Sequence, residues 1–257
     1  MLSIELLEIV GPALAAGLMI ALTHAPLGIE VLRRGIIFID LAIAQIAGLG
    51  LVAAGLYMKD APWWMAQSVA LACALLAGLF FRLIERKLPR QQEAVIGTSF
   101  ILAASLALLL LADSPHGGEE VRHLLSGQVL FVTWPHVLAH APVYAIILSL
   151  WFLMPRIRRS IWFYILFAMA ITSSVQLVGV YVVFASLIIP ALSSVRAARP
   201  HITGWLCGVL AVVTGIALSA WLDLPAGPFL VVAYVIMCLM VLAVRRIYRL
   251  KNYSTDG

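Results

Sequence analysis

The chain has 257 residues, of which 63% are hydrophobic and only 11% carry a formal charge; this composition excludes a soluble protein, which needs polar residues for its surface. The net charge of +5 comes from short basic clusters between apolar runs and not from a continuous basic stripe, so it does not indicate nucleic-acid binding. Cys73, Cys207 and Cys238 each lie in an apolar segment without a CxxC spacing, which indicates packing and not a disulfide framework.

Apolar runs recur along the whole chain, and each is long enough to cross about 30 Å of hydrocarbon as a helix. We therefore predict an all-α, polytopic membrane bundle that forms a single transmembrane domain over residues 1–257. The first run has no Lys or Arg before Arg33, so it lacks the positive segment of a cleavable signal peptide and is expected to be a retained span. Nine segments are expected, with eight as the alternative, at 6–32, 38–57, 63–82, 94–112, 136–154, 161–177, 178–195, 202–222 and 227–244.

The basic residues are distributed unequally between the two sets of connections that alternating segments would form. One set contains all of the 17 basic residues except Lys59 and Arg122. The positive-inside rule assigns that set to the cytoplasm, which places the N-terminus outside and the C-terminus in the cytoplasm. We therefore expect a multi-pass protein of the cell inner (plasma) membrane.

Ionisable and strongly polar residues inside the apolar segments are costly, which makes His24, Asp40 and Gln45 candidates for a translocation pathway. Pro26 should free a backbone carbonyl near His24 that can line a cavity. Asp40 and Gln45 are about 140° apart around a helix, yet both could edge one cavity between helices. The alternatives are a capping or interhelical role for His24 and a helix cap for Asp40.

The most polar external connection, residues 113–128, contains His116, Glu119, Glu120 and His123. The pairs His116/Glu120 and Glu119/His123 have the i, i+4 spacing that brings an imidazole and a carboxylate together on a helix. His116 and His123 are therefore candidate metal ligands, for capture of an ion or for chemistry in a membrane metalloenzyme. The alternative is a solvated loop, because two glycines interrupt the segment.

Other polar positions have simpler interpretations. His136 and His140 are expected at a membrane interface, and Asp223 is expected in a turn before Pro225. The sequence contains no GxxxxGK[ST], GxSxG or HExxH motif, so we expect neither a P-loop ATPase nor a serine or zinc protease. No catalytic residue is assigned, and no permanently bound cofactor is expected.

Five stretches of the chain, in this order, resemble the permease family of ABC-type importers for zinc, manganese and iron. The resemblance implies a permease subunit of an ATP-driven importer of a divalent metal, with zinc favoured over manganese or iron. It also implies a paired permease copy, cytoplasmic ATPase subunits that alone bind ATP, and an external metal-binding protein. The stretches are LGIEVLRRGIIFIDLAIAQIAGLG (27–50), EAVIGTSFILAASLALLL (93–110), LLSGQVLFVTW (124–134), LVGVYVVFASLIIPAL (177–192) and DLPAGPFLVVAYV (223–235).

The resemblance also suggests where the ATPase binds. In the related family of iron-chelate and cobalamin importers, the turn after a similar Pro and Arg is the coupling segment that lies in a groove of the ATPase. Here that role falls to residues 190–201, with Pro190, Arg196 and Arg199. Pro190 cannot donate a backbone hydrogen bond and arginine suits a protein contact, although an ordinary basic loop would contain the same residues.

Two features depart from the family pattern. Gln45 stands where the family usually has a histidine, by its spacing from Gly50, and Asp40 lies one residue early, which leaves His24 to compensate as a ligand. The cytoplasmic segment after the fifth span is only PRIRRS (155–160), in place of a longer acidic-Pro-acidic segment. The competing hypothesis is an ion-gradient-driven metal transporter or channel without an ATPase, which the scarcity of acids in the apolar segments disfavours.

Overall fold

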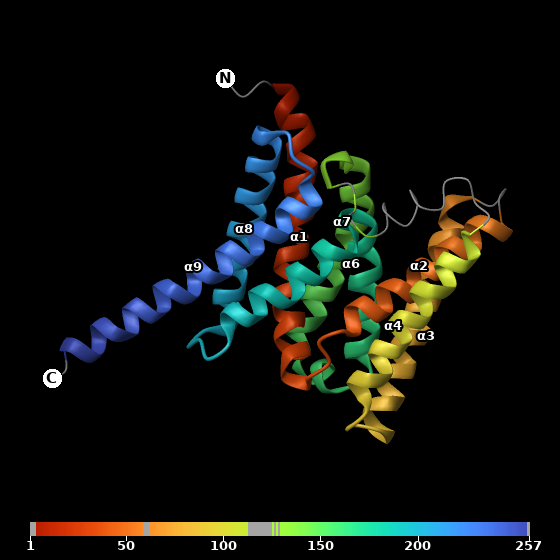
Figure 1. Cartoon of the computed structure of the whole chain (residues 1–257), viewed down its shortest axis with the longest axis horizontal. Coiled ribbons are helices and arrows are strands. Elements are labelled where there is room, and N and C mark those ends of the chain that lie inside the picture. Colours follow the sequence, from red (N-terminus) through yellow and green to blue (C-terminus); the bar gives the residue numbers. More distant parts are fainter. Residues whose placement is uncertain (1–3, 59–61, 113–124, 126, 128, 256–257) are drawn as a thin grey trace.

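The chain is a bundle of long helices, as the computed structural model in Figure 1 shows. It describes all residues except 1–3, 59–61, 113–124, 126, 128 and 256–257. In the described part every regular element is a helix, which confirms the all-α prediction. Helices are expected because a backbone in hydrocarbon must satisfy its own hydrogen bonds. The elements are α1 (Ile4–Arg34), α2 (Ile39–Tyr57), α3 (Trp63–Lys87), α4 (Gln92–Leu110), η1 (Val129–Phe131), α6 (Trp134–Leu153), η2 (Pro155–Arg159), α7 (Trp162–Ser194), α8 (Pro200–Leu222) and α9 (Ala226–Thr255).

Eight helices within the described residues are long and apolar enough to cross a membrane, so the chain is a multi-pass membrane protein. Helices α1 and α7 form the centre, because 67% and 72% of their most apolar windows are buried, against 17% in α4 and 22% in α6. Helix α7 contacts α1, α2, α3, α6, α8 and α9. In Figure 1, α8 and α9 lie on one side of this centre and α2, α3 and α4 on the other.

Helix α7 is broken at Gly179, which has φ 78° and ψ 164°. This conformation is open to glycine and strained for residues with a Cβ. The break divides α7 into a first arm, residues 162–178, and a second arm, residues 180–194, which run in different directions (Figure 1). The two segments predicted at 161–177 and 178–195 are these arms, so the predicted boundary lies close to the break.

Helix α1 crosses the second arm at a close approach. A Cβ at Gly28 would lie 2.0 Å from the carbonyl oxygen of Leu187, so only glycine fits there. Helix α1 continues through Pro26, which has no N–H to donate to the carbonyl of Leu22. The indole Nε1–H of Trp205 donates to that oxygen instead, at 2.8 Å. The carbonyl that the sequence predicted to be free therefore joins α1 to α8.

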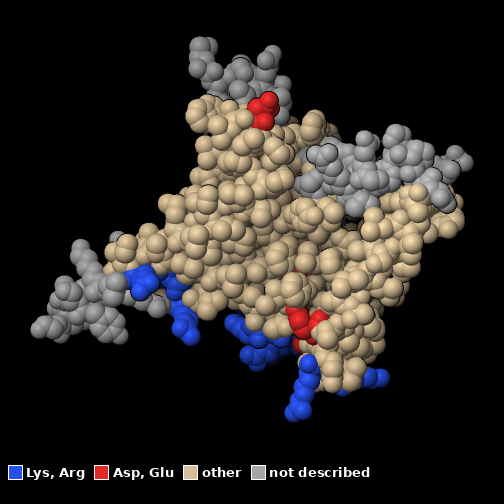
Figure 2. Space-filling model, viewed as in Figure 1, with Lys and Arg blue, Asp and Glu red and all other residues tan. Residues whose placement is uncertain are grey.

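Basic side chains gather along one edge of the molecule, as Figure 2 shows. Ion pairs join helix ends there: Arg34 bonds to Glu30 at 3.0 Å and to Glu85 at 2.9 Å, and Arg82 also pairs with Glu85. Arg34 also donates to the carbonyl of Arg158. A common edge for the ends of α1 and α3 and for η2 is what the alternation of basic connections predicts. Assignment of this edge to the cytoplasm stays a prediction.

Candidate functional site

The imidazole of His24 is fully buried where α1 crosses the two arms of α7. Its Nδ1 lies 2.7 Å from Oγ of Ser186, and its Nε2 lies 3.0 Å from Oγ of Ser174. Ser174 belongs to the first arm and Ser186 to the second. One side chain of α1 therefore holds both arms of the broken helix.

Counting hydrogens assigns the protonation of this network. Ser186 donates its hydroxyl hydrogen to the carbonyl of Val183 at 2.9 Å, so its Oγ accepts from Nδ1–H of a neutral His24. Nε2 then carries the lone pair and accepts from the hydroxyl of Ser174. The hydroxyl of Tyr144 lies 2.8 Å from Ser174 and completes the chain as a donor. Every polar group of the network is satisfied, which a buried network requires.

Helix α6 extends this polar path. Tyr144 is buried, and one turn earlier Nδ1 of His140 lies 2.7 Å from Oγ of Ser173. The sequence predicts His136 and His140 alike as interface residues, but their environments differ. His136 is exposed and completes the N-terminal cap of α6 with Thr133, whereas His140 is half-buried against α7.

Asp40 lies in the first turn of α2, is 1% exposed, and has no hydrogen-bond partner on either carboxylate oxygen among the described residues. It does not cap α2. The N-terminal N–H of Phe38 donates to Oε1 of Glu93, from α4, at 3.2 Å. Oε2 of Glu93 is also buried without a partner, and the two carboxylates are near enough to interact electrostatically. This pair needs a positive charge or protons to be stable.

Within the described residues no hydrogen bond joins the three predicted pathway residues to one another. His24 uses both ring nitrogens on α7, so neither is bonded to Asp40. Gln45 is half-buried in the middle of α2. His24 and Asp40 lie instead on two helices that both pack against α7. No group of three or more His, Cys, Asp or Glu is placed to hold a metal within the described residues, and His116 and His123 fall outside them.

The predicted coupling segment is a short turn between α7 and α8, whose helices end at Ser194 and begin at Pro200. Pro190 is buried within the second arm, while Arg196 and Arg199 are exposed. Arg196 has a positive φ of 57°. Arg245 of α9 is bonded to this turn, because its guanidinium donates to the carbonyl oxygens of Ser193 and Val195. The turn therefore presents arginines at the surface on a backbone that α9 fixes.

Comparison with known proteins gives a family match over almost the whole chain. The model of the ABC 3 transport family matches residues 6–161 and 157–245. The high-affinity zinc uptake system membrane protein ZnuB of Haemophilus influenzae is 24% identical over 248 residues, which cover 88% of this chain and 93% of ZnuB. An uncharacterised membrane protein of Synechocystis is 26% identical over 93% of this chain and 92% of its own length.

Two solved structures share the fold. A chain of PsaBC from Streptococcus pneumoniae, in complex with a Fab, superposes with a TM-score of 0.72 and 18% identity, over 90% of both chains. A chain described as a metal-chelate type ABC transporter in an inward-facing conformation superposes with a TM-score of 0.64 and 18% identity, over 95% of this chain and 85% of the other. These two chains therefore share the overall fold of this chain.

Proposed function

Because the chain belongs to the ABC 3 transport family, we propose that it is the membrane-spanning permease subunit of an ATP-driven importer of a divalent metal ion, with zinc as the favoured ion. The name of the Haemophilus influenzae relative, a zinc uptake protein, supports zinc, and manganese or iron are the alternatives. The lack of a nucleotide-binding motif requires that a partner subunit hydrolyse ATP. The permease itself is a transporter subunit and not an enzyme.

The observation that carries this proposal is the buried His24, which bridges both arms of α7. A neutral imidazole nitrogen with a lone pair is a good zinc ligand, and Nε2 of His24 carries that lone pair. A buried ionisable residue in a membrane helix is costly and is by default a candidate for a functional site such as a transport pathway. Asp40 and Gln45 supply oxygen ligands further along α2. The separate, incomplete sites suit an ion that has to leave again.

The remaining parts of the transporter follow from the same proposal. A second permease copy pairs with this chain, an external protein delivers the metal, and two ATPase subunits bind the turn that Arg196 and Arg199 present. His116 and His123 are the candidate ligands on the delivery side. Closure of the ATPase pair moves the turn, and the second arm of α7, which ends at this turn, transmits the movement to His24.

Uptake of metal into proteoliposomes tests the proposal. The chain is reconstituted with its cognate ATPase and binding protein, and zinc, manganese and ferrous iron are compared with ATP inside and without it. We expect ATP-dependent uptake with zinc preferred. His24→Phe should reduce uptake by about tenfold or more, the scale on which loss of a ligand or its support affects metal sites.

A matched control separates the role of the site from general damage. His136→Gln also removes an imidazole, but it lies at an exposed helix cap where glutamine can replace it. This variant should transport normally. Uptake that needs no ATPase would refute the importer and support a channel or gradient-driven transporter. Normal uptake by a folded His24→Phe variant would remove His24 from the pathway while leaving the importer in place.

A further inference from the structure

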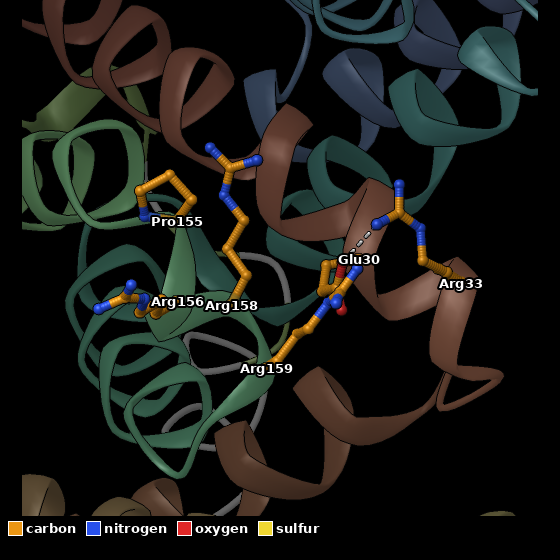
Figure 3. A pocket seen from close by; sticks show the side chains of 6 residues that line it. All are labelled: Glu30, Arg33, Pro155, Arg156, Arg158 and Arg159. Carbon is orange, nitrogen blue, oxygen red and sulfur yellow. Dashed lines mark hydrogen bonds and ion pairs between the residues drawn. The ribbon is translucent and has the colours of Figure 1, made fainter.

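A basic pocket lies at the edge where α1 ends and η2 connects α6 to α7. Figure 3 shows its lining, which consists of Glu30, Arg33, Pro155, Arg156, Arg158 and Arg159. Its volume is about 310 Å³, which is enough for the headgroup of a phospholipid. Four arginines face one glutamate, so the lining has an excess of positive charge.

The single glutamate is already paired with two arginines of α1, and one of these, Arg33, also lines the pocket. Glu30 is 7% exposed and pairs with Arg33 at 3.2 Å and with Arg34 at 3.0 Å. Arg34 is not part of the pocket lining and also bonds to Glu85. Within the described residues, Glu30 and Glu85 therefore pair with Arg33, Arg34 and Arg82 and form no ion pair with the arginines of η2.

The arginines of η2 divide into a structural one and two exposed ones. Arg158 donates to the carbonyl oxygen of Trp151 at 3.0 and 3.2 Å, and its guanidinium lies 5.3 Å from the centre of the Trp151 ring. Ile157 is buried and anchors the turn. Arg156 and Arg159 are exposed, and within the described residues neither has an ion-pair partner. The turn therefore contributes to the pocket lining two guanidinium groups without an ion-pair partner among the described residues, and Arg33 belongs to the same lining.

Exposed apolar side chains flank the same turn. Leu153 and Met154 precede it and are 79% and 53% exposed, and Ile161 and Trp162 follow it and are 43% and 54% exposed. They end one membrane span and begin the next, so they lie at the level where hydrocarbon meets headgroups. An occupant must therefore satisfy guanidinium groups and cover apolar surface at once. An acidic soluble protein would do only the first.

We propose that this pocket binds the phosphate of an anionic phospholipid, such as phosphatidylglycerol. Arg156, Arg159 and Arg33 bind the phosphate, and the acyl chains lie along Leu153 and Trp162. Arginine is suited to this role because its planar fork matches phosphate oxygens. Basic pockets between membrane helices are a recognised form of lipid site. The proposal is independent of the metal that the chain transports.

Native mass spectrometry of the full chain in detergent measures the binding directly, with phosphatidylglycerol compared with zwitterionic phosphatidylcholine. We expect the chain to retain phosphatidylglycerol in preference, and thermal unfolding to show that this lipid stabilises it. The double variant Arg156→Gln/Arg159→Gln should bind phosphatidylglycerol about 25-fold more weakly, from about fivefold for each basic residue near an anionic surface.

The matched control removes the same charge elsewhere on the same edge. Arg86→Gln/Arg90→Gln changes two exposed arginines outside the pocket, one in the last turn of α3 and one in the connection to α4, and should alter binding by less than about twofold. Arg156→Lys/Arg159→Lys keeps the charge and serves if the glutamine variant fails to fold; it should retain a preference for phosphatidylglycerol over phosphatidylcholine.

Three results would overturn the proposal. The first is an equal loss of lipid in the pocket and control variants, which would indicate a general charge effect. The second is full stabilisation by inorganic phosphate alone, which would indicate a site for a free anion. The third is displacement of the lipid by the ATPase subunit together with loss of ATPase binding in the glutamine variant, which would assign the pocket to a protein interface.

Discussion

Trp205 of α8 donates its indole N–H to the carbonyl oxygen of Leu22, the carbonyl in α1 that Pro26 leaves without a partner. The proline thus removes one hydrogen bond from α1 and leaves the Leu22 oxygen free to accept the bond that attaches α8 to α1. The bond lies less than a turn from His24, so it also fixes the part of α1 that holds the imidazole.

Trp205→Phe should destabilise the protein, because it leaves the Leu22 oxygen without its donor. We expect a loss of about 0.5 to 2 kcal/mol in thermal unfolding in detergent. Trp221→Phe is the control, since Trp221 is 79% exposed. In a Pro26→Ala background the backbone N–H of residue 26 returns to Leu22, so Trp205→Phe should cost less there. An equal cost in both backgrounds would contradict the assignment.

Gly28→Ala should disrupt the crossing of α1 and α7, since its Cβ would collide with the backbone oxygen of Leu187. Backbone atoms cannot rotate away as a side-chain end can, so we expect a loss of about 2 kcal/mol or more and reduced uptake. Gly97→Ala in α4 is the control: a Cβ there meets no atom within 4 Å and should stabilise the helix by about 0.5 to 1 kcal/mol. A neutral Gly28→Ala would mean that the helices separate easily.

Asp40→Asn should stabilise the purified chain and reduce transport. The buried carboxyl group has no hydrogen-bond partner among the described residues and interacts electrostatically with Glu93, so a neutral amide that needs no proton should raise stability by about 1 to 3 kcal/mol in metal-free buffer. Thermal unfolding and zinc uptake are measured on the same preparations. Asp223→Asn, at an exposed turn, should change neither. Full uptake by Asp40→Asn would remove Asp40 from the pathway.

Arg245→Ala should release the turn between α7 and α8, because Arg245 donates to the carbonyls of Ser193 and Val195. We expect the ATPase subunit to bind about three- to tenfold more weakly, as loss of about 1 kcal/mol of ordering implies. Pull-down titration with the purified ATPase measures this. Arg246→Ala changes an exposed neighbour and should have no effect. Equal binding by wild type and Arg245→Ala would show that the ATPase does not depend on this turn.

The fold could be predicted well from the sequence because the bilayer leaves few choices. Runs of apolar residues had to be helices, and the basic residues had to collect at one edge. The division of residues 161–195 into two segments anticipated the break at Gly179 within two residues. The contacts between helices could not be predicted in this way. Helix α1 packs on α7 and α8, and the start of α2 is bonded to Glu93 of α4 through the N–H of Phe38.

The partners of His24 could not be predicted for a geometric reason. In a straight helix Ser174 and Ser186 would be about 18 Å apart along the axis and about 120° apart around it, so no single imidazole could reach both. Only the glycine break brings them to opposite sides of one ring. A serine on each side of a glycine in an otherwise apolar helix is the signal that would have indicated the pair.

The break at Gly179 also has an energetic consequence. Nε2 of His24, the nitrogen with the lone pair, is occupied by the hydroxyl of Ser174. A zinc ion that takes this nitrogen has to displace the serine, and with it one of the two bonds that hold the arms together through α1. On the proposed function, in which His24 binds the ion, loading of the ion and loosening of the hinge are coupled by the same free energy. A mutation that straightens or frees the hinge is then expected to alter metal affinity even though it touches no ligand.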